Sequence, residues 1–572
     1  MIRVRIKPVS PLPLSMSSSP TPRLTLTHWL IIAVASIGFL FDTYELLMTP
    51  LVGVPAIAEL LALPPNNPVV MQWIGKLQWM SAACGGIFGL LGGWLIDRFG
   101  RKRIMAASIF LYAFSPFASA LSTSIGWFLF FRCATFVGVC VEFVAAITWL
   151  AELFPDRRQR EIALGSTQAF ASLGGLFVTG VNAWIVAHAN SLPALPLPEI
   201  FNAHATWRYA LLTGLLPAIP IALMLPFVPE SQIWKEKRAS GTLQRPSIGA
   251  LFSPELRRVT LVTALLSACA YAAAFGALQL TPRSIAPGLP ELADQRKTME
   301  PLNGEAKELN KQFLAVTPSF NAALAEVPGL RELTALRSKN RIAFRAANSK
   351  GAKDQVAALG ANFKQLQIKL DELTSGKPEA KKAVVDREKL LKALGDNREK
   401  IAPADTGVKE RANKMQFYQE TGGLVGRIIL AILVVTAIAR RRLLQLFIVP
   451  GLAVLPVAYF HLYHTGGSAF DWGIFFSGLL IVAQFSFFGE YLPKVFPLHL
   501  RGTGGSFATN VGGRMIGTSA AYLTTNIVAP LITGQNEFDK VAVAAGIVGT
   551  AVFVIAFAAS YFLPEPKTEM IE

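Results

Sequence analysis

Acidic and basic side chains interrupt several of the longest apolar stretches of this 572-residue chain. Asp42 and Glu45 lie in GFLFDTYELLM, three residues apart, so a helix would carry them on one face. Arg132 and Glu142 lie in a second apolar stretch. In apolar surroundings a carboxyl group favours its neutral, protonated form, whereas a nearby guanidinium favours the carboxylate. Carboxyl groups placed in this way can bind and release a proton when their pairing changes.

The composition indicates what surrounds these charges. The chain is 52% hydrophobic and only 16% charged, and its mean hydropathy is +0.43. The charge is unevenly spread, because long stretches are nearly uncharged and one internal stretch is highly charged. This pattern indicates a membrane protein with a polar insert. The net charge of +17 fits an excess of Lys and Arg on cytoplasmic loops, so nucleic acid is not an expected partner. The four cysteines lie in apolar stretches, and His461 and His464 have no third ligand nearby, so neither a disulfide framework nor a metal site is expected.

Twelve stretches are apolar enough to cross a membrane as helices, which takes about 20 residues each. The predicted spans are 27–50, 71–96, 104–123, 126–149, 163–188, 207–228, 259–281, 420–439, 443–464, 471–493, 503–527 and 541–563. They form an N-terminal six-helix bundle (27–228) and a C-terminal one (259–283 with 417–563), joined by a polar linker (229–258). The predicted fold class is therefore an all-α membrane protein with two six-helix, pseudo-symmetric bundles.

The short loops predict the orientation of the chain. Clusters of Lys and Arg follow the even-numbered spans, and the other short loops carry almost none. This pattern puts the linker and both tails (1–26, expected to be disordered, and 564–572) in the cytoplasm of a multi-pass cell-membrane protein. Residues 284–416 then form a charged insert on the outer face, with apolar residues at the spacing of two to four amphipathic helices. The insert is either a spacer or an arm that captures substrate or docks a protein partner.

The loop between the second and third spans, GGWLIDRFGRKR, carries a specific pattern of charges and glycines. Gly100 permits a tight turn, Gly93 permits close helix packing, and Asp97 can pair with bases nearby. The residues of the pattern are Gly93, Asp97, Arg98, Gly100, Arg101, Lys102 and Arg103. They resemble the signature loop of the major facilitator superfamily. The resemblance implies a transporter that works by alternating access, with this loop holding the cytoplasmic side closed.

Further stretches carry the same resemblance through both halves. RCATFVGVCVEF…AELFPDRRQR looks like the fourth helix and its following loop, VPESQIWK resembles a stretch after the sixth helix in sugar porters, and FPLHLRGTGG matches the loop after the tenth. The gating residues that these stretches add are Glu152, Pro155, Arg160, Glu230 and Arg501. ARRRLL is a degraded copy of the signature loop, and LPEPK resembles the family's ending. The paired glutamines expected in the seventh helix of sugar porters are absent, since only Gln279 is present.

The family fold implies roles for the buried polar residues. Asp42 is predicted to carry the proton, with Arg132 as its switchable partner and Glu142 or Glu45 as the next candidates; the alternative is a permanent structural pair of Asp42 and Arg132. Polar residues on helices that line the family's central cavity are the candidate substrate contacts, although each could serve only as an interhelical hydrogen bond. They are Tyr44, Gln168, Asn182, Gln484, Asn510 and Arg514.

The predicted function is proton-coupled symport of a small polar metabolite. A sugar is favoured by VPESQIWK and by TQAFASLGGLFVTGVN, whose Gln168, Gly174 and Asn182 have a spacing similar to the fifth helix of sugar porters. An organic acid is favoured by the missing glutamines and by Arg427 and Arg514, which could hold a carboxylate. The alternatives are a proton-coupled exporter and a transporter-like receptor that works through the insert. The sequence has no Walker loop, G-x-S-x-G or catalytic His/Cys/acid cluster, so the chain is not expected to be an enzyme. The expected coupling ion is a proton, no cofactor is expected, and the chain is expected to be a monomer in the bilayer.

Overall fold

The computed structural model describes residues 25–154, 157–216, 218–240, 248–349, 351–434, 438–497 and 500–566. All regular secondary structure in these ranges is helical. The N-terminal half contains α1 (Leu26–Leu61), α2 (Pro68–Phe99), α3 (Arg101–Ala120), α4 (Ile125–Leu153), α5 (Arg157–His188), η1 (Ala189–Ser191), α6 (Thr206–Leu212), η2 (Thr213–Leu215), α7 (Ala218–Met224) and η3 (Leu225–Phe227). The short helices α8 (Gln232–Ala239) and η4 (Ile248–Phe252) lie in the linker.

The C-terminal half begins with α9 (Arg257–Gly276), which continues through the short turns η5 (Leu278–Leu280), η6 (Thr281–Ile285), η7 (Ala286–Gly288) and η8 (Pro290–Leu292). The insert follows as α10 (Ala293–Glu326), α11 (Leu330–Ser349), α12 (Lys353–Leu373) and the first part of α13 (Pro378–Val434). The remaining helices are α14 (Arg440–Pro456), η9 (Val457–Leu462), α15 (Tyr463–Thr465), α16 (Gly467–Val495), α17 (Arg501–Ser506), η10 (Phe507–Gly517), α18 (Ala520–Tyr522), η11 (Leu523–Val528), η12 (Ala529–Leu531) and α19 (Glu537–Ser560).

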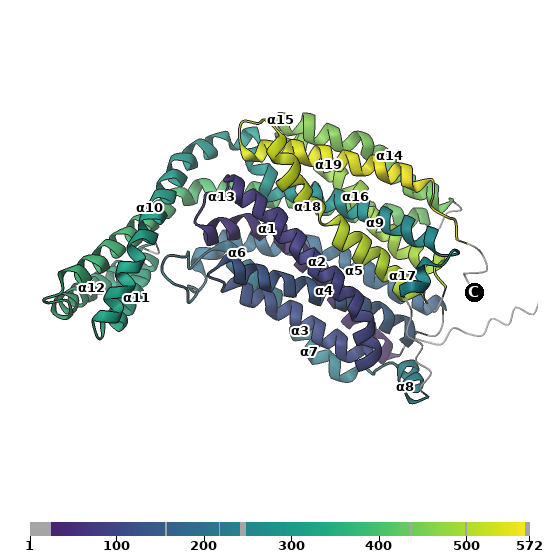
Figure 1. The fold of residues 1–572 in the computed structure, drawn as a ribbon, viewed down its shortest axis with the longest axis horizontal. Helices are drawn as coiled ribbons and strands as arrows, with labels where there is room; N and C mark the ends of the chain where they lie inside the picture. Colours follow the sequence, from purple (N-terminus) through teal and green to yellow (C-terminus); the bar gives the residue numbers. More distant parts are fainter. Residues whose placement is uncertain are drawn as a thin grey trace, which may run out of the picture.

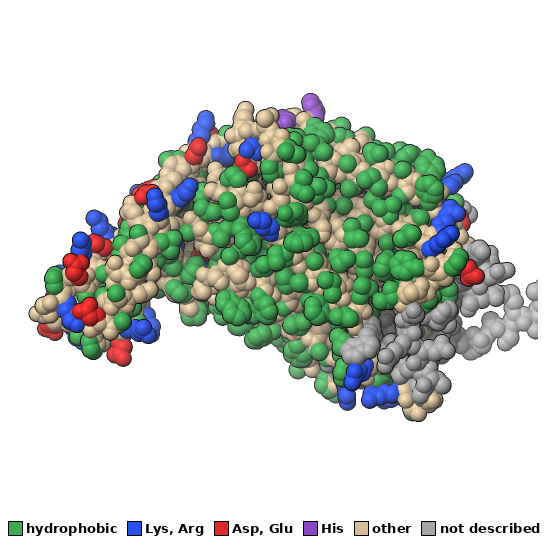
Figure 2. Space-filling model, in the orientation of Figure 1, with side chains coloured by type: hydrophobic (Ala, Val, Ile, Leu, Met, Phe, Trp, Pro, Cys, Tyr) green, Lys and Arg blue, Asp and Glu red, His purple; other side chains and the backbone are tan. Residues whose placement is uncertain are grey.

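The predicted all-α membrane fold is confirmed. Nine helices of the described residues are long and apolar enough to cross a membrane. The predicted spans 2, 5 and 11 correspond to α2, α5 and the run from α17 to η11, which are helical as well. Figure 2 shows a broad band of hydrophobic side chains over the body of the molecule, with charged side chains gathered at its two ends. This distribution is the one that a bilayer requires.

The insert projects from the end of the molecule opposite to α8, α17 and the C-terminus (Figure 1). Its own core contains Phe320, Leu330 and Leu370, and the buried Arg337 pairs with Glu388. The predicted boundary at residue 416 falls inside α13, which runs for 57 residues without a break from the insert into the membrane body. Hydropathy places a boundary where polarity changes, but a helix continues through such a change when its backbone hydrogen bonds are intact.

The insert also contacts the N-terminal half directly. Arg341 pairs with Glu199, on the connection between α5 and α6, at 3.3 Å, and Arg398 donates to the backbone carbonyl of Ile200. The Ile200 side chain packs against the cluster of Phe313, Leu391 and Leu394. Since α13 belongs to the C-terminal half, these contacts join the two halves at the end that carries the insert.

Candidate functional site

An ion pair joins the two halves in the interior of the membrane body. Asp42 of α1 accepts a hydrogen bond from Nη2 of Arg514, in η10, at 2.9 Å. Both residues are at most 4% exposed. The prediction that Asp42 pairs with Arg132 is therefore wrong in this structure. The two partners are 472 residues apart in the chain, and their contact depends on how the two bundles pack, which a single segment of sequence does not report.

The Arg514 guanidinium is surrounded by polar and aromatic groups of α4 and of its own helix. It lies 3.4 Å from the carbonyl oxygen of Val139 and 3.5 Å from Oδ1 of Asn510, and its centre is 4.8 Å from the centroid of the Phe143 ring. Glu142 is completely buried, interacts electrostatically with Asp42 and Arg514, and has no hydrogen-bond partner for either carboxyl oxygen among the described residues. Two carboxyl groups thus interact with one guanidinium, which is paired with Asp42, so these three groups are together neutral only when they hold one proton.

Arg132 has a different set of partners, all within the N-terminal half. Its guanidinium lies 3.5 Å from Oε2 of Glu45 and donates to the Glu45 backbone carbonyl at 3.1 Å and to Oγ1 of Thr49. Arg132 and Glu45 are both fully buried. One acid and one base balance each other here, as expected for a pair that ties α1 to α4.

The predicted substrate contacts separate into two groups. Asn510 and Arg514 lie together in the central cluster. The Tyr44 hydroxyl is hydrogen-bonded to Thr213, Asn182 donates to Asn413 of α13 at 2.6 Å, and Gln484 donates to a carbonyl of its own helix. These three side chains therefore serve interhelical or local contacts in this conformation.

A second buried polar cluster was not predicted from the sequence. Oε1 of Glu420, in α13, accepts hydrogen bonds from Gln416 at 3.0 Å, from Gln419 at 2.9 Å and from Gln279 at 3.4 Å. Glu420 also lies against Gly175 of α5, where a Cβ atom would overlap Oε2 of the carboxylate. Glu420 is the first residue of the predicted span 420–439. The available signal was the polar stripe of Asn413, Gln416, Glu420 and Arg427, which recurs at helical spacing along α13.

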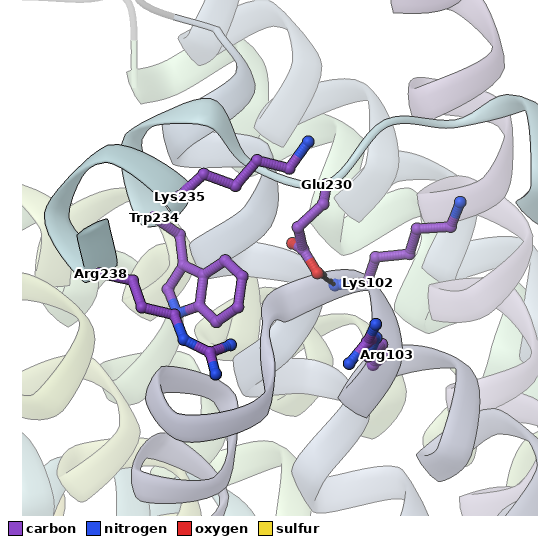
Figure 3. Close-up of a pocket in the computed structure, with 6 residues that line it drawn as sticks. All are labelled: Lys102, Arg103, Glu230, Trp234, Lys235 and Arg238. Atoms are coloured by element: carbon purple, nitrogen blue, oxygen red, sulfur yellow. Dashed lines mark hydrogen bonds between the residues drawn. The ribbon is translucent and has the colours of Figure 1, made fainter.

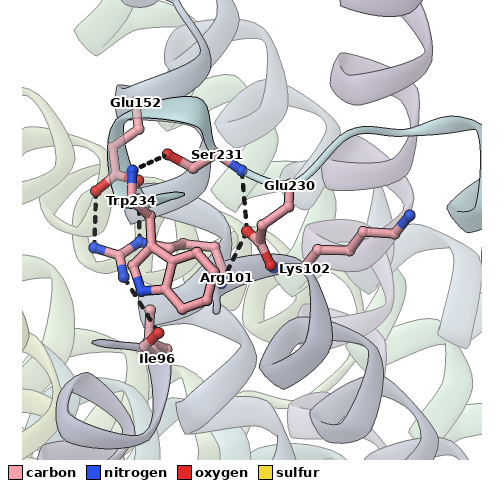
Figure 4. Close-up of polar contacts among 7 residues, drawn as sticks. All are labelled: Ile96, Arg101, Lys102, Glu152, Glu230, Ser231 and Trp234. Atoms are coloured by element: carbon pink, nitrogen blue, oxygen red, sulfur yellow. Dashed lines mark hydrogen bonds and ion pairs between the residues drawn. The ribbon is translucent and has the colours of Figure 1, made fainter. Parts of the chain in front are cut away.

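The charged loop between α2 and α3 forms a compact cluster at the opposite end of the molecule from the insert (Figure 4). Gly100 makes the turn with φ = 100°, a conformation that side chains disfavour. The Arg101 guanidinium donates to both oxygens of Glu152, at 3.0 and 2.8 Å, and to the Ile96 carbonyl at 3.2 Å. Glu230 accepts from the backbone N–H groups of Arg101 and Lys102, at 3.0 and 3.2 Å. Its carboxylate thereby caps the N-terminus of α3.

The linker completes this cluster. Ser231 accepts from the Trp234 backbone N–H at 3.1 Å and begins α8. A pocket of about 420 Å³ opens beside it, lined by Lys102, Arg103, Glu230, Trp234, Lys235 and Arg238 (Figure 3). Arg98 lies over the Phe99 ring. Pro155 lies outside the described residues, and so do the side chains of Asp97, Arg160, Gln168 and Arg501 and the surroundings of Gly93.

A matching arrangement stands at the same end of the C-terminal half. Glu565 accepts from the backbone N–H groups of Arg440 and Arg441, both at 3.0 Å, at the start of α14. The Arg440 guanidinium pairs with Glu490 at 3.2 Å and donates to the Val434 carbonyl at 3.0 Å. The ARRRLL and LPEPK stretches therefore repeat the contacts of the first cluster without its glycine and Asp.

Comparison with known proteins agrees with this arrangement. Residues 34–293 match the model of the Major Facilitator Superfamily. The D-xylose-proton symporter structure superposes over 94% of this chain and 98% of its own, with a TM-score of 0.55 at 15% identity. The chain is thus similar to the major facilitator superfamily in the sequence of its first half and in its overall fold. The family match covers the first half and α9, and the likeness in fold extends to the second half.

Two curated transport proteins of Acinetobacter baylyi are also similar in sequence. The chain is 30% identical to the niacin transporter NiaP over 210 residues, 36% of this chain and 41% of the relative. It is 29% identical to the cis,cis-muconate transport protein over 175 residues, 31% of this chain and 38% of the relative. The chain thus spans about two fifths of the length of these relatives in the alignments. The matches are to transport proteins and not to enzymes.

Proposed function

We propose that the chain is a transporter of the major facilitator superfamily, and specifically a symporter that carries an organic acid together with a proton. The single observation that carries the proposal is the central cluster, in which Asp42 pairs with Arg514 and the buried Glu142 lies close enough to interact electrostatically with both. A carboxylate is the ligand that a buried guanidinium binds best. The names of the two relatives, which transport niacin and cis,cis-muconate, favour an acid over a sugar.

The coupling follows from competition for one cation. A substrate carboxylate that binds Arg514 replaces Asp42. Asp42 and Glu142 are then two acids in an apolar interior without that cation between them, and uptake of a proton removes the unpaired charge. Because Asp42 and Arg514 stand on different halves, the replacement also removes a contact between the halves. Proton binding, substrate binding and the rocking of the bundles are thereby linked.

The proposed setting is the cell membrane, with the linker and both termini in the cytoplasm. The chain would then present the Arg101 and Arg440 clusters to the cytoplasm and the insert to the outer face, which agrees with their positions at opposite ends of the molecule.

Reconstituted protein tests the proposal. Proteoliposomes with a trapped pH dye are given nicotinate, cis,cis-muconate or D-xylose, and acidification of the lumen is followed. We expect acidification with at least one acid and none with the sugar. We expect Asp42→Asn to abolish it, and Asp354→Asn, on the exposed face of α12, to leave it unchanged. Acid uptake without proton movement, or acidification that survives Asp42→Asn, contradicts the proposal.

A further inference from the structure

The Glu420 cluster contains more hydrogen-bond acceptors than the described residues use. Gln279, Gln416 and Gln419 all direct their amide NH2 groups to the same carboxyl oxygen of Glu420. Their three carbonyl oxygens are buried and have no hydrogen-bond partner among the described residues. The four side chains are between 0% and 7% exposed. A buried acceptor without a donor is unfavourable, so this arrangement is stabilised by any ligand that supplies donors.

The cluster lies at the depth of the central ion pair. At 1.5 Å per helical residue, Asp42 lies about 24 Å along α1, and Glu420 lies about 21 Å before the end of α13. The start of α1 and the end of α13 are the helix ends that face the Arg101 and Arg440 clusters. Arg514, in the run that starts with α17, lies at the depth of Asp42 because the two side chains are paired at 2.9 Å. Both groups of side chains therefore occupy the same layer of the membrane body.

Tyr271 connects the two groups. It interacts electrostatically with Arg514 and with Arg427, and Arg427 interacts with Glu420 on the same helix. The Tyr271 ring also packs against Phe485, with ring centroids 4.6 Å apart. Tyr271 therefore lies close enough to interact with a cation of each group, Arg514 on one side and Arg427 on the other.

The cluster also bridges the two halves. Gly175 of α5 leaves the space that the Glu420 carboxylate occupies. Two turns earlier in α13, Asn413 accepts a hydrogen bond from Asn182 of α5. A ligand held by Glu420 would therefore contact the surface along which the halves separate. Such a position suits a group that recognises substrate better than one that only stabilises a single bundle.

We propose that Glu420, Gln279, Gln416 and Gln419 bind the hydroxyl end of a hydroxylated organic acid whose carboxylate is held by Arg514. This inference rests on the proposed function and adds the substrate class: an acid with a hydrogen-bond donor at a distance from its carboxylate. The site requires a hydrogen-bond donor on the ligand, because its carboxylate and three amide oxygens accept hydrogen bonds and repel a second carboxylate. A site built around a substrate hydroxyl discriminates strongly against the analogue that lacks it.

The test compares benzoate with its 2-, 3- and 4-hydroxy derivatives as substrates of the reconstituted full chain. In the wild type we expect one isomer to exceed benzoate in kcat/KM by about tenfold or more. Glu420→Gln should remove that preference while it leaves benzoate within about threefold of its wild-type rate. Glu420→Asp, which keeps the charge but withdraws it by one methylene group, should lower the preference without abolishing it. Glu410→Gln, at an exposed position of the same helix, is the matched control.

The outcomes separate this inference from the proposed function. Transport of benzoate without preference for any hydroxylated isomer overturns the subsite alone, as does an equal loss for benzoate and its isomers in Glu420→Gln, which is the result of a structural role. A requirement for Na⁺ that disappears in Glu420→Gln assigns the acceptors to a cation and also overturns it. If no acid is transported, the proposed function fails. Binding of the same four acids, measured by thermal shift, then tests the subsite separately. If the shift does not depend on the hydroxyl group, the subsite is overturned.

Discussion

The polar clusters at the starts of α3 and α14 make the same kinds of contact with different sequences. In each, a carboxylate that follows the last helix of its half, Glu230 or Glu565, caps the first N–H groups of the helix. In each, the first arginine of the helix, Arg101 or Arg440, pairs with an acid at the end of a neighbouring helix. The first cluster adds a bidentate pair and a glycine turn, and the second adds an ion pair between Lys494 and Glu490.

The comparison shows which parts of the family signature the capping contact requires. Capping needs only a carboxylate near free N–H groups, so ARRRLL and LPEPK provide it without the glycine or the Asp. The N-terminal cluster is more buried and has more contacts, with side-chain exposures of 6% and 19% for Arg101 and Glu152 against 18% and 20% for Arg440 and Glu490. We therefore expect the two clusters to respond similarly to loss of a cap and differently to loss of an arginine.

The largest expected effect is that of Arg101→Ala. It leaves Glu152 partly buried without its bidentate partner, and we expect a loss of about 3 kcal/mol in the free energy of unfolding. Arg440→Ala removes one contact to Glu490, in a more exposed ion pair, and a hydrogen bond to the Val434 carbonyl. It should cost about 1 kcal/mol. Unfolding titrations in detergent micelles measure both. Equal losses would show that the two arginines contribute equally to stability, which contradicts the expected difference between the clusters.

The second prediction concerns the glycine turn. Gly100→Ala places a side chain at φ = 100° and presses Cβ against the Glu230 carboxylate. We expect it to lower the free energy of unfolding by about 2 kcal/mol. Ala439, at the equivalent N-cap of α14, has φ = −55°, so Ala439→Gly should change it by only a few tenths, roughly 0.3 kcal/mol. The same titrations measure both variants. An unchanged free energy of unfolding in Gly100→Ala would contradict the stabilising role assigned to the glycine turn.

The third prediction concerns an effect of similar size in the two halves, smaller than those of Arg101→Ala and Gly100→Ala. Glu230→Gln and Glu565→Gln each remove the negative charge at a helix N-terminus, and each should cost about 1 kcal/mol of unfolding free energy. The loss should shrink in high salt for both, because exposed charges are screened. A cost for Glu230→Gln alone would sharpen the difference between the clusters, since Glu565 would then contribute a contact without a measurable stabilisation.

The sequence predicted the parts that depend on local pattern. Apolar stretches of spanning length marked the membrane helices. The gating residues predicted from three separate stretches include Arg101, Glu152 and Glu230, which the structure brings together. The partner of Asp42 was not predictable in this way, because it comes from the other half of the chain and is fixed by bundle packing. Glu420 was missed because α13 enters the membrane from a polar insert without interruption, so hydropathy places the boundary at this residue.

The most direct test of the central claim follows the proton that accompanies substrate binding. Purified protein in weakly buffered detergent solution is mixed with nicotinate, and the pH change is compared with the amount of nicotinate bound. The account predicts uptake of about one proton for each acid bound by the wild type. It predicts that Asp42→Asn still binds nicotinate through Arg514 but takes up no proton. Binding without proton uptake in the wild type, or unchanged uptake in Asp42→Asn, would contradict the exchange of Asp42 for substrate at Arg514.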